Sequence, residues 1–241
     1  MSDRILYYGA ASARGLIGTV DGNNVLKDVT VYPKGSFADD WTEITALSGN
    51  RILYYGAASA RGLIGTINGD NVLKDVTEYP AGSFADDWTQ ITALSGDRIL
   101  FYGAASARGL IGIVDDNNVL KDVTPYPAGS FAEDWTQITA LSGDRILYYA
   151  AASARGLIGT INGDNVLEDV TEYPAGSFAD DWTQITALSG DRILYYAAAS
   201  GRGLIGSVDD ENVLRDVKVF PDGSFADDWT NITDLNLHAI L

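Results

Sequence analysis

The feature that most constrains this chain is an internal period of 47 residues. Its five tryptophans are each 47 residues apart, and an Arg-Ile-Leu motif recurs at the same interval from Arg4 to Arg192. A fixed period of this length is typical of folds in which each copy is one small supersecondary unit. The chain divides into five units, at residues 4–50, 51–97, 98–144, 145–191 and 192–238.

The hydrophobic pattern inside one unit predicts four short strands, because runs of β-branched and aromatic residues are separated by turn residues. In the second unit these strands are expected at residues 51–55, 62–67, 71–77 and 88–94. Asn68-Gly69 predicts a hairpin turn between two of them. Four antiparallel strands in each of five units predict an all-β fold, a five-bladed β-propeller, with residues 1–241 as one domain. An open β-solenoid is the alternative, although its repeats are usually shorter and parallel.

The final residues continue the period in a degenerate form. Residues 235–241 align with the start of another unit, but His238 and Ala239 stand where other copies have Asp and Arg. We expect a modified terminus that packs near the first strand, at the seam where the ring closes.

Composition excludes several classes of function. The net charge of −17, from 16 basic and 33 acidic residues, argues against nucleic acid as a partner, since phosphate binding needs clustered Lys and Arg. No apolar run approaches the roughly 20 residues of a membrane-spanning helix. The first residues lead directly into repeat sequence, so we expect no signal peptide, no membrane insertion, and a soluble monomer. The absence of cysteine and the single histidine remove thiolate and His-based metal or catalytic sites, and no cofactor or metal is expected.

Comparison of the copies within the chain selects candidate binding residues. The fifth unit differs from the second at 17 positions, yet several polar and loop positions are identical in all five units. Among them are Arg61, Asn71, Phe84, Asp87 and Trp88 with their equivalents. The candidate sugar-binding residues are therefore Asp40, Trp41, Asp87, Trp88, Asp134, Trp135, Asp181, Trp182, Asp228, Trp229, Arg14, Arg61, Arg108, Arg155, Arg202, Asn24, Asn71, Asn118, Asn165, Asn212, Phe37, Phe84, Phe131, Phe178 and Phe225.

Each candidate also has a purely structural interpretation. The tryptophan could be packing between blades, and the aspartate before it could bind backbone N–H groups of its loop. Arg61 could form an ion pair with Asp75 or Asp87, within or between blades. Asn71 fits an Asx turn, and the loop phenylalanine could fill a gap against the neighbouring blade.

Two further motifs have simpler explanations. The acidic turn residues 115–116 and 209–211 could attract calcium, but their spacing matches no calcium-loop template, and we expect solvated turns. Asn231-Ile232-Thr233 fits the N-glycosylation pattern and occurs once.

The order of motifs also resembles a known family. A Gly-Leu-Ile-Gly-Thr-Ile strand, an Asn-Val-Leu-Lys-Asp strand, Tyr-Pro, Asp-Asp-Trp and Ile-Leu-Tyr-Tyr follow one another, with small differences between copies, in an order that resembles the 47-residue blade of the tachylectin-2 family. The resemblance covers the whole chain and implies a multivalent lectin that binds N-acetylated sugars between neighbouring blades. The family's Gly-Gly-Trp loop is replaced here by Ser95-Gly96-Asp97, so fucose-binding and tectonin-type propellers are alternatives.

These observations favour glycans as the partner, with one equivalent site per blade. Aromatic surfaces with a few convergent polar groups suit sugars, and several weak sites on one rigid body gain through effective concentration. Such a lectin would act outside the cell or in a defence granule. We expect no enzyme activity, because no unit holds a unique catalytic constellation. The alternative is an engineered symmetric scaffold without a ligand, favoured by units 2 and 4, which differ only at Gly56/Ala150 and Lys74/Glu168.

Overall fold

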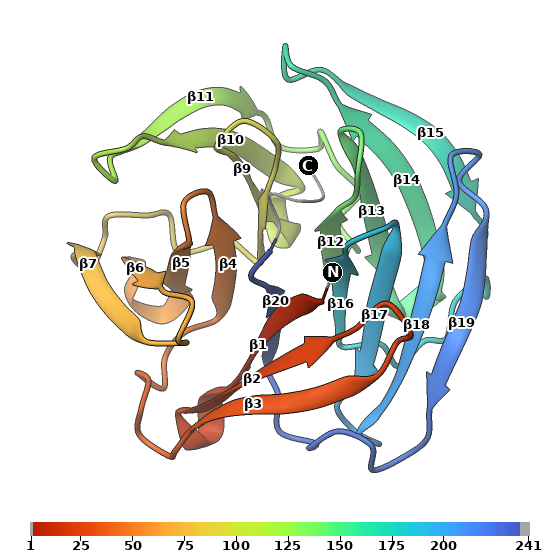
Figure 1. Ribbon diagram of the computed structural model, residues 1–241. Helices are drawn as coiled ribbons and strands as arrows, with labels where there is room; N and C mark the ends of the chain where they lie inside the picture. The colour runs from red at the N-terminus through yellow and green to blue at the C-terminus, as the bar shows by residue number, and fades with distance from the viewer. Residues whose placement is uncertain (1, 237–241) are drawn as a thin grey trace.

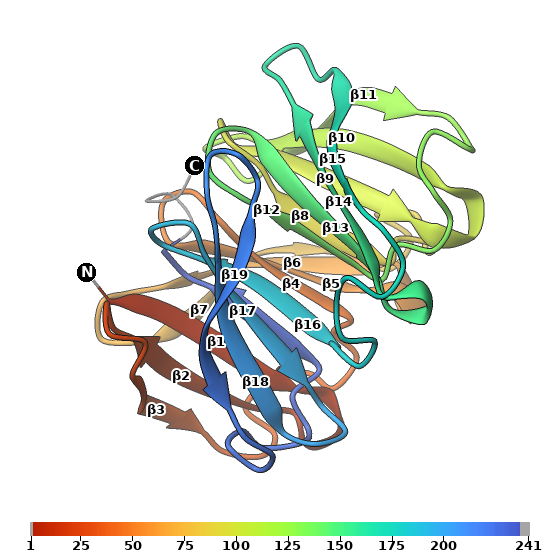
Figure 2. The ribbon, with the colours of Figure 1, turned by 90° about the vertical axis from the view of Figure 1, so that its right-hand side faces the viewer.

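Five four-stranded antiparallel sheets surround one axis (Figure 1). The structure, a computed structural model, describes residues 2–236. Each sheet is a blade, and Figure 2 shows how strongly a blade twists from its inner to its outer strand. The all-β five-bladed propeller that the 47-residue period predicts is confirmed.

The strands are assigned to blades by their hydrogen-bonded order, from the axis outward. Blade 1 holds β20 (Asn231–Asp234), β1 (Asp3–Gly9), β2 (Arg14–Val20) and β3 (Leu26–Tyr32). Blade 2 holds β4 (Glu43–Leu47), β5 (Arg51–Gly56), β6 (Arg61–Ile67) and β7 (Leu73–Tyr79). Blade 3 holds β8 (Gln90–Ala93), β9 (Arg98–Gly103), β10 (Arg108–Val114) and β11 (Leu120–Tyr126). Blade 4 holds β12 (Gln137–Ala140), β13 (Arg145–Ala150), β14 (Arg155–Ile161) and β15 (Leu167–Tyr173). Blade 5 holds β16 (Gln184–Leu188), β17 (Arg192–Ala197), β18 (Arg202–Val208) and β19 (Leu214–Phe220). Four blades also carry a 3-10 turn: η1 (Ala10–Ser12), η2 (Ala57–Ser59), η3 (Ala104–Ser106) and η4 (Ala151–Ser153).

Each blade is offset by one strand from the sequence unit that contains most of it. The innermost strand is the last strand of the preceding unit, so the first blade takes its inner strand from the other end of the chain. There β20 pairs antiparallel with β1, with Tyr8 opposite Asn231, and Leu235 N donates to Arg4 O at 2.7 Å. The ring is thus closed by strand pairing between the two ends, while residues 237–241 of the predicted terminal tail lie outside the described residues.

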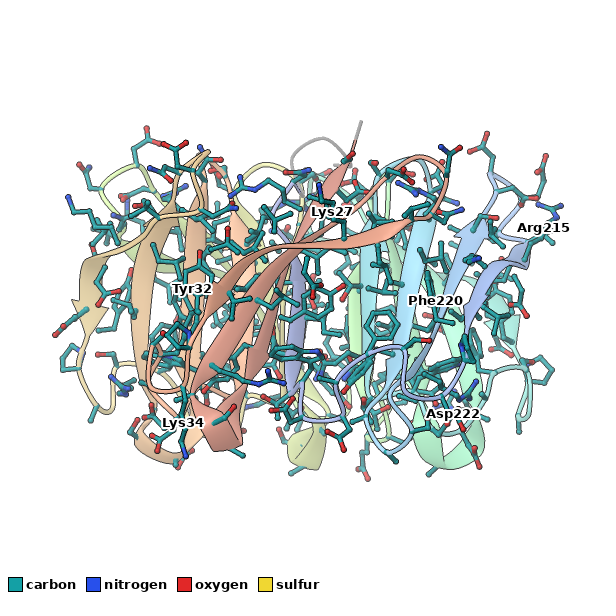
Figure 3. The ribbon with its side chains drawn as sticks, turned by 60° about the horizontal axis from the view of Figure 1, so that its bottom comes forward. Lys27, Tyr32, Lys34, Arg215, Phe220 and Asp222 are labelled. Carbon is teal, nitrogen blue, oxygen red and sulfur yellow. The ribbon has the colours of Figure 1, made fainter. Side chains whose placement is uncertain are left out.

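The two ends of the propeller carry different segments. One end, the turn face, carries short turns, which in blade 2 are residues 48–50 and 68–72. The other end, the loop face, carries the 3-10 turns and the crossover loops that join one blade to the next, such as residues 33–42. In Figure 3, Lys27 lies toward the turn face and Lys34 on the loop face.

The turn after β6 differs from the two-residue hairpin that Asn68-Gly69 predicts. Asn68 Oδ1 accepts hydrogen bonds from the N–H groups of Asp70 and Val72, and the left-handed residue is Asn71, at φ 61°. An asparagine side chain can replace part of the backbone of a turn in this way. The result is a longer loop that carries Asn71 toward the neighbouring blade.

The core lies between blades. Between blades 1 and 2, for example, Leu6, Ile17, Ile52 and Ile67 are buried with the aromatic ring of Tyr8. Because successive strand residues point to opposite faces of a sheet, the two adjacent aromatic residues of each unit, Tyr-Tyr in four units and Phe101-Tyr102 in the third, serve different sides. The second tyrosine is fully buried and donates its hydroxyl to a crossover carbonyl, as in Tyr8 to Ala38 O at 2.7 Å.

A closed ring of hydrogen bonds joins the inner strands around the axis. One threonine of each inner strand donates its hydroxyl to an isoleucine carbonyl of the next blade, as in Thr45 to Ile91 O at 2.6 Å. The same contact recurs at every boundary, including the seam, where Thr233 donates to Ile44 O. These side chains satisfy carbonyls on the inner edge of each sheet, which a strand edge would otherwise leave unpaired.

Candidate functional site

A concave pocket lies beside the crossover loop at blades 1, 2, 4 and 5. At blade 2 it is bounded by the crossover loop 33–42 and by β5, β6 and β7, and it has a volume of about 400 Å³. The equivalent pockets at blades 1, 4 and 5 have volumes of about 230, 190 and 310 Å³. We call these the inter-blade pockets. Their size is near the lower end of small-molecule sites, which span about 300–1,000 Å³.

Arginine, aspartate and tryptophan, three of the predicted residue types, meet at the wall of this pocket. The Arg61 guanidinium donates to both carboxylate oxygens of Asp40, at 2.8 and 2.6 Å, and its Cζ lies 4.1 Å from the Trp41 ring centroid. The hydrogen bonds from Arg61 hold the pKa of Asp40 below its usual value. Bidentate pairing and stacking satisfy all three groups before any ligand arrives.

The same arrangement occurs at every boundary. The ion pairs join Arg14 to Asp228, Arg61 to Asp40, Arg108 to Asp87, Arg155 to Asp134 and Arg202 to Asp181. Each arginine thus binds the crossover aspartate at the start of its own blade and does not bind the strand aspartate equivalent to Asp75. Trp41 is only 5% exposed, and its equivalents are buried to the same degree. The indole is therefore packing material with an arginine over it, and little of its ring is open for stacking on a sugar.

The crossover phenylalanine lies between the blades. The Phe37 ring contacts the rings of Tyr8 and Tyr32 edge-on at 5.6 and 5.5 Å. A Cβ on Gly15 would come within 2.6 Å of Phe37 Cε2, so the ring rests directly on that glycine. Phe37 is half-buried and closes one side of the pocket.

The fifth predicted type, asparagine, lies away from the pockets on the turn face. Asn71 accepts a hydrogen bond from Arg4, donates to Thr30 Oγ1, and its carbonyl accepts from the Tyr32 hydroxyl. All three partners belong to the neighbouring blade. Arg192, Arg51, Arg98 and Arg145 likewise bind Asn24, Asn118, Asn165 and Asn212. The asparagines therefore join blades, and they do not line the inter-blade pockets.

Two pocket residues are missing from the predicted set. Tyr54, the first of the two adjacent tyrosines, is 4% exposed and lines the pocket. Within residues 2–236 its hydroxyl has no hydrogen-bond partner. Burial raises the pKa of Tyr54 above its usual value, and the negative charge of Asp75 raises it further.

Asp75 is the second pocket residue outside the predicted set, and its carboxylate is not paired as that of Asp40 is. It lies on β7 opposite Gly65, where the register shifts, and its exposed carboxylate has no ion-pair partner in the described part of the chain. An aspartate occupies this exposed position in all five units, at residues 28, 75, 122, 169 and 216. The presence of aspartate at this position in every unit is the sequence feature that could have selected Asp75. The pocket thus offers a free acceptor, Asp75, and a hydroxyl donor, Tyr54.

The acidic turns form local hydrogen bonds. Asp115 Oδ1 accepts from the N–H groups of Asn117 and Val119, and Lys121 pairs with its other oxygen at 2.9 Å. Among residues 2–236 no group of three or more His, Cys, Asp or Glu side chains could hold a metal ion.

The glycosylation pattern lies in a buried strand. Asn231 is 6% exposed on β20, and Thr233 Oγ1 lies within hydrogen-bond range of both Ile44 O of the neighbouring blade and Asn231 Oδ1. The folded chain does not present this asparagine to a glycosylating enzyme. No helix in the described residues is long and apolar enough to cross a membrane.

The axial channel carries two carboxylates that break the fivefold pattern. Glu43 stands where the next three blades have glutamine, and Asp234 stands where other inner strands have alanine. Burial raises the pKa of Glu43 to about 8 and that of Asp234 to about 7. Asp234 is 1% exposed, and its Oδ2 has no hydrogen-bond partner among the described residues.

Comparison with known proteins places the chain by fold. No protein-family model matches it, and no curated protein matches it in sequence. Among solved structures, a functionally unknown protein from Desulfotomaculum acetoxidans is 11% identical with a TM-score of 0.53, over 95% of this chain and 73% of that one. A putative 6-phosphogluconolactonase from Bacteroides uniformis is 15% identical with a TM-score of 0.52, over 96% and 71%. A second from Bacteroides fragilis is 13% identical with a TM-score of 0.50, over 96% and 70%.

These similarities correct one expectation from the sequence. The prediction that the chain is not an enzyme is wrong, because two of these structures of the same fold are named as putative lactonases. The fold therefore does not exclude enzyme activity. At this identity the likeness shows the fold alone. None of the three is named as a lectin, so membership of the tachylectin-2 family stays a prediction.

Proposed function

We propose that this chain is a multivalent carbohydrate-binding protein whose sites are the inter-blade pockets. The observation that carries the proposal is that a tyrosine hydroxyl and a carboxylate, neither hydrogen-bonded within the described residues, face one concave pocket. A hydroxyl donor and a carboxylate acceptor that the protein leaves unpaired can bind a ligand without first breaking an internal hydrogen bond. Tyr54 and Asp75 supply this pair at blade 2.

The chemistry of the pocket suits an N-acetylated hexose. The Tyr54 hydroxyl would donate to a carbonyl or ring oxygen, and the Asp75 carboxylate would accept from an amide or hydroxyl. Leu63 and Leu73, both half-buried in the pocket wall, offer apolar surface for the acetamide methyl or the C–H face of the ring.

Repetition supports multivalent binding. The pockets recur around one rigid ring, so a surface with many copies of a sugar can occupy several at once. Avidity of this kind can exceed the affinity of a single site by roughly 10²–10⁴-fold. A single monosaccharide would accordingly bind weakly, and a glycan-coated surface strongly.

A glycan-array screen tests the proposal, repeated with free N-acetylglucosamine as competitor. The decisive variant replaces the free carboxylate by asparagine in every unit, at Asp28, Asp75, Asp122, Asp169 and Asp216. Losing a charged hydrogen bond at each site should weaken binding at least about tenfold. The matched control neutralises five exposed crossover carboxylates instead, at Asp39, Asp86, Glu133, Asp180 and Asp227, and should bind as the parent does.

One alternative to a binding function has specific support. The mutual pairing of arginine, aspartate and tryptophan shows that several repeated residues serve the joints between blades. This agrees with a symmetric scaffold that holds no ligand. A parent chain that binds nothing on the array at high concentration would favour the scaffold over the lectin.

A further inference from the structure

The five blade boundaries are not chemically equivalent at the tyrosine that lines the pocket. This position is Tyr7, Tyr54, Tyr148 and Tyr195 in four blades and Phe101 in blade 3. The Phe101 ring is held in the same way, because its centroid lies 5.7 Å from that of Trp88, against 5.6 Å for Tyr54 and Trp41. Blade 3 has thus lost the hydroxyl while keeping the ring in place.

The residues around Phe101 also differ from those around Tyr54. Leu120 Cδ1 would lie 3.1 Å from a Cβ on Gly112, whereas no leucine atom comes that near at the equivalent Gly65; both glycines otherwise face a strand carbonyl and an aromatic ring. Pro125 stands where blades 2 and 4 have Glu78 and Glu172 and where blades 1 and 5 have Val31 and Val219. The blade 3 boundary therefore lacks the hydroxyl, and a leucine side chain comes closer to its floor.

Resting on the carbohydrate-binding function proposed above, we infer that the chain has four competent sugar sites and that the pocket tyrosine determines which they are. Asp122 is still present at blade 3, but no hydroxyl lies beside it to donate to the ligand. A sugar oxygen buried against Phe101 would lose its hydrogen bond to water without gaining another. The resulting loss of affinity should be about tenfold or more.

The hydroxyl donor also restricts the class of sugar. The phenol at four boundaries needs an acceptor on the ligand, while the adjacent carboxylate needs a donor. An acetamido group carries both, as a C=O and an N–H. N-acetylated hexoses should therefore distinguish the four tyrosine pockets from the blade 3 boundary more sharply than hexoses that lack this group.

Counting bound N-acetylglucosamine at saturation tests the inference, by equilibrium dialysis against the labelled sugar. The parent chain should bind four molecules, Phe101→Tyr should bind five, and Tyr54→Phe should bind three. Both substitutions place a residue that other units already carry at the same position, so both variants should fold, and thermal unfolding checks this. Tyr32→Phe is the matched control, because the Tyr32 hydroxyl already donates to Asn71 O on the turn face and blade 5 has Phe220 at this position. It should still bind four.

The outcomes separate this inference from the function on which it rests. Five molecules on the parent, with no change in Phe101→Tyr, would overturn the role of the tyrosine and leave carbohydrate binding standing. Binding that does not depend on Tyr54 would overturn it as well. No binding by any variant would overturn both.

Discussion

Arg61 on β6 binds both carboxylate oxygens of Asp40, which lies in the crossover loop at the start of the same blade. The pair ties the loop to the sheet and positions the guanidinium over Trp41. Each blade carries this contact, so residues that first suggest a ligand site hold the crossover loops in place. The groups left for a ligand are the tyrosine and the second aspartate beside them.

The ion pair makes Asp40 a stability residue. We expect Asp40→Asn to lower the free energy of unfolding by about 1 kcal/mol, because a bidentate pair that is a third exposed gives a modest gain. The neighbouring Asp39→Asn, which removes an exposed carboxylate with the same charge, should change stability by less than about 0.5 kcal/mol. Urea unfolding of both variants checks this. Equal effects would contradict a specific role for the pair.

The five ion pairs also predict a loss of stability in acid. The pKa values of Asp40, Asp87, Asp134, Asp181 and Asp228 are lowered by their arginines, so the stabilisation is complete above the unfolded-state value near 3.8. It is lost as the pH falls through the lower folded-state values. Unfolding free energies measured from pH 6 to pH 2.5 should fall steeply below pH 4. In a variant with asparagine at all five positions, the unfolding free energy should fall less between pH 4 and pH 2.5.

Glu43 predicts the opposite slope at higher pH. Its pKa rises from 4.5 unfolded to about 8 folded, so the folded state holds the proton more tightly and stability falls as pH rises between these values. Glu43→Gln restores the residue of the neighbouring inner strands. It should raise stability by about 1–3 kcal/mol at pH 8.5 and have little effect at pH 4. Urea titrations at the two pH values test this, and a gain of equal size at both would contradict the buried-carboxylate explanation.

The contact of phenylalanine with glycine is a steric prediction. A Cβ on Gly62 would lie 2.5 Å from Phe84 Cε2, so Gly62→Ala should destabilise the chain by about 1–3 kcal/mol. Gly69→Ala is the control, because a Cβ there meets no atom within 4 Å. Thermal unfolding of the two variants should separate them by several degrees. A tolerated alanine at residue 62 would show that the crossover loop can move away.

The sequence predicts the fold well, because a 47-residue period with four strand-like segments has few solutions. It does not predict that each blade takes its inner strand from the preceding unit, since pairing across the ring depends on contacts between units. It also does not predict the longer turn after β6, where the Asn68 side chain replaces backbone hydrogen bonds.

The site is only partly predictable from the sequence. Period and identity identify Arg61, Asp40 and Trp41 but do not reveal that they satisfy one another. Tyr54 and Tyr55 are adjacent and alike, and only the direction of each side chain shows which one lines a pocket. Asp75 had a sequence signal, since an aspartate stands at its position in all five units, but the pocket around it is built from the crossover loop of one unit and the strands of the next.

The most direct test of the central claim is a crystal structure of the chain soaked in N-acetylglucosamine. We expect ordered sugar in the inter-blade pockets, with an oxygen in hydrogen-bond range of the Tyr54 hydroxyl and a donor on Asp75. Sugar bound only on the turn face or in the axial channel, with the tyrosine pockets empty of it, would contradict carbohydrate binding at these pockets.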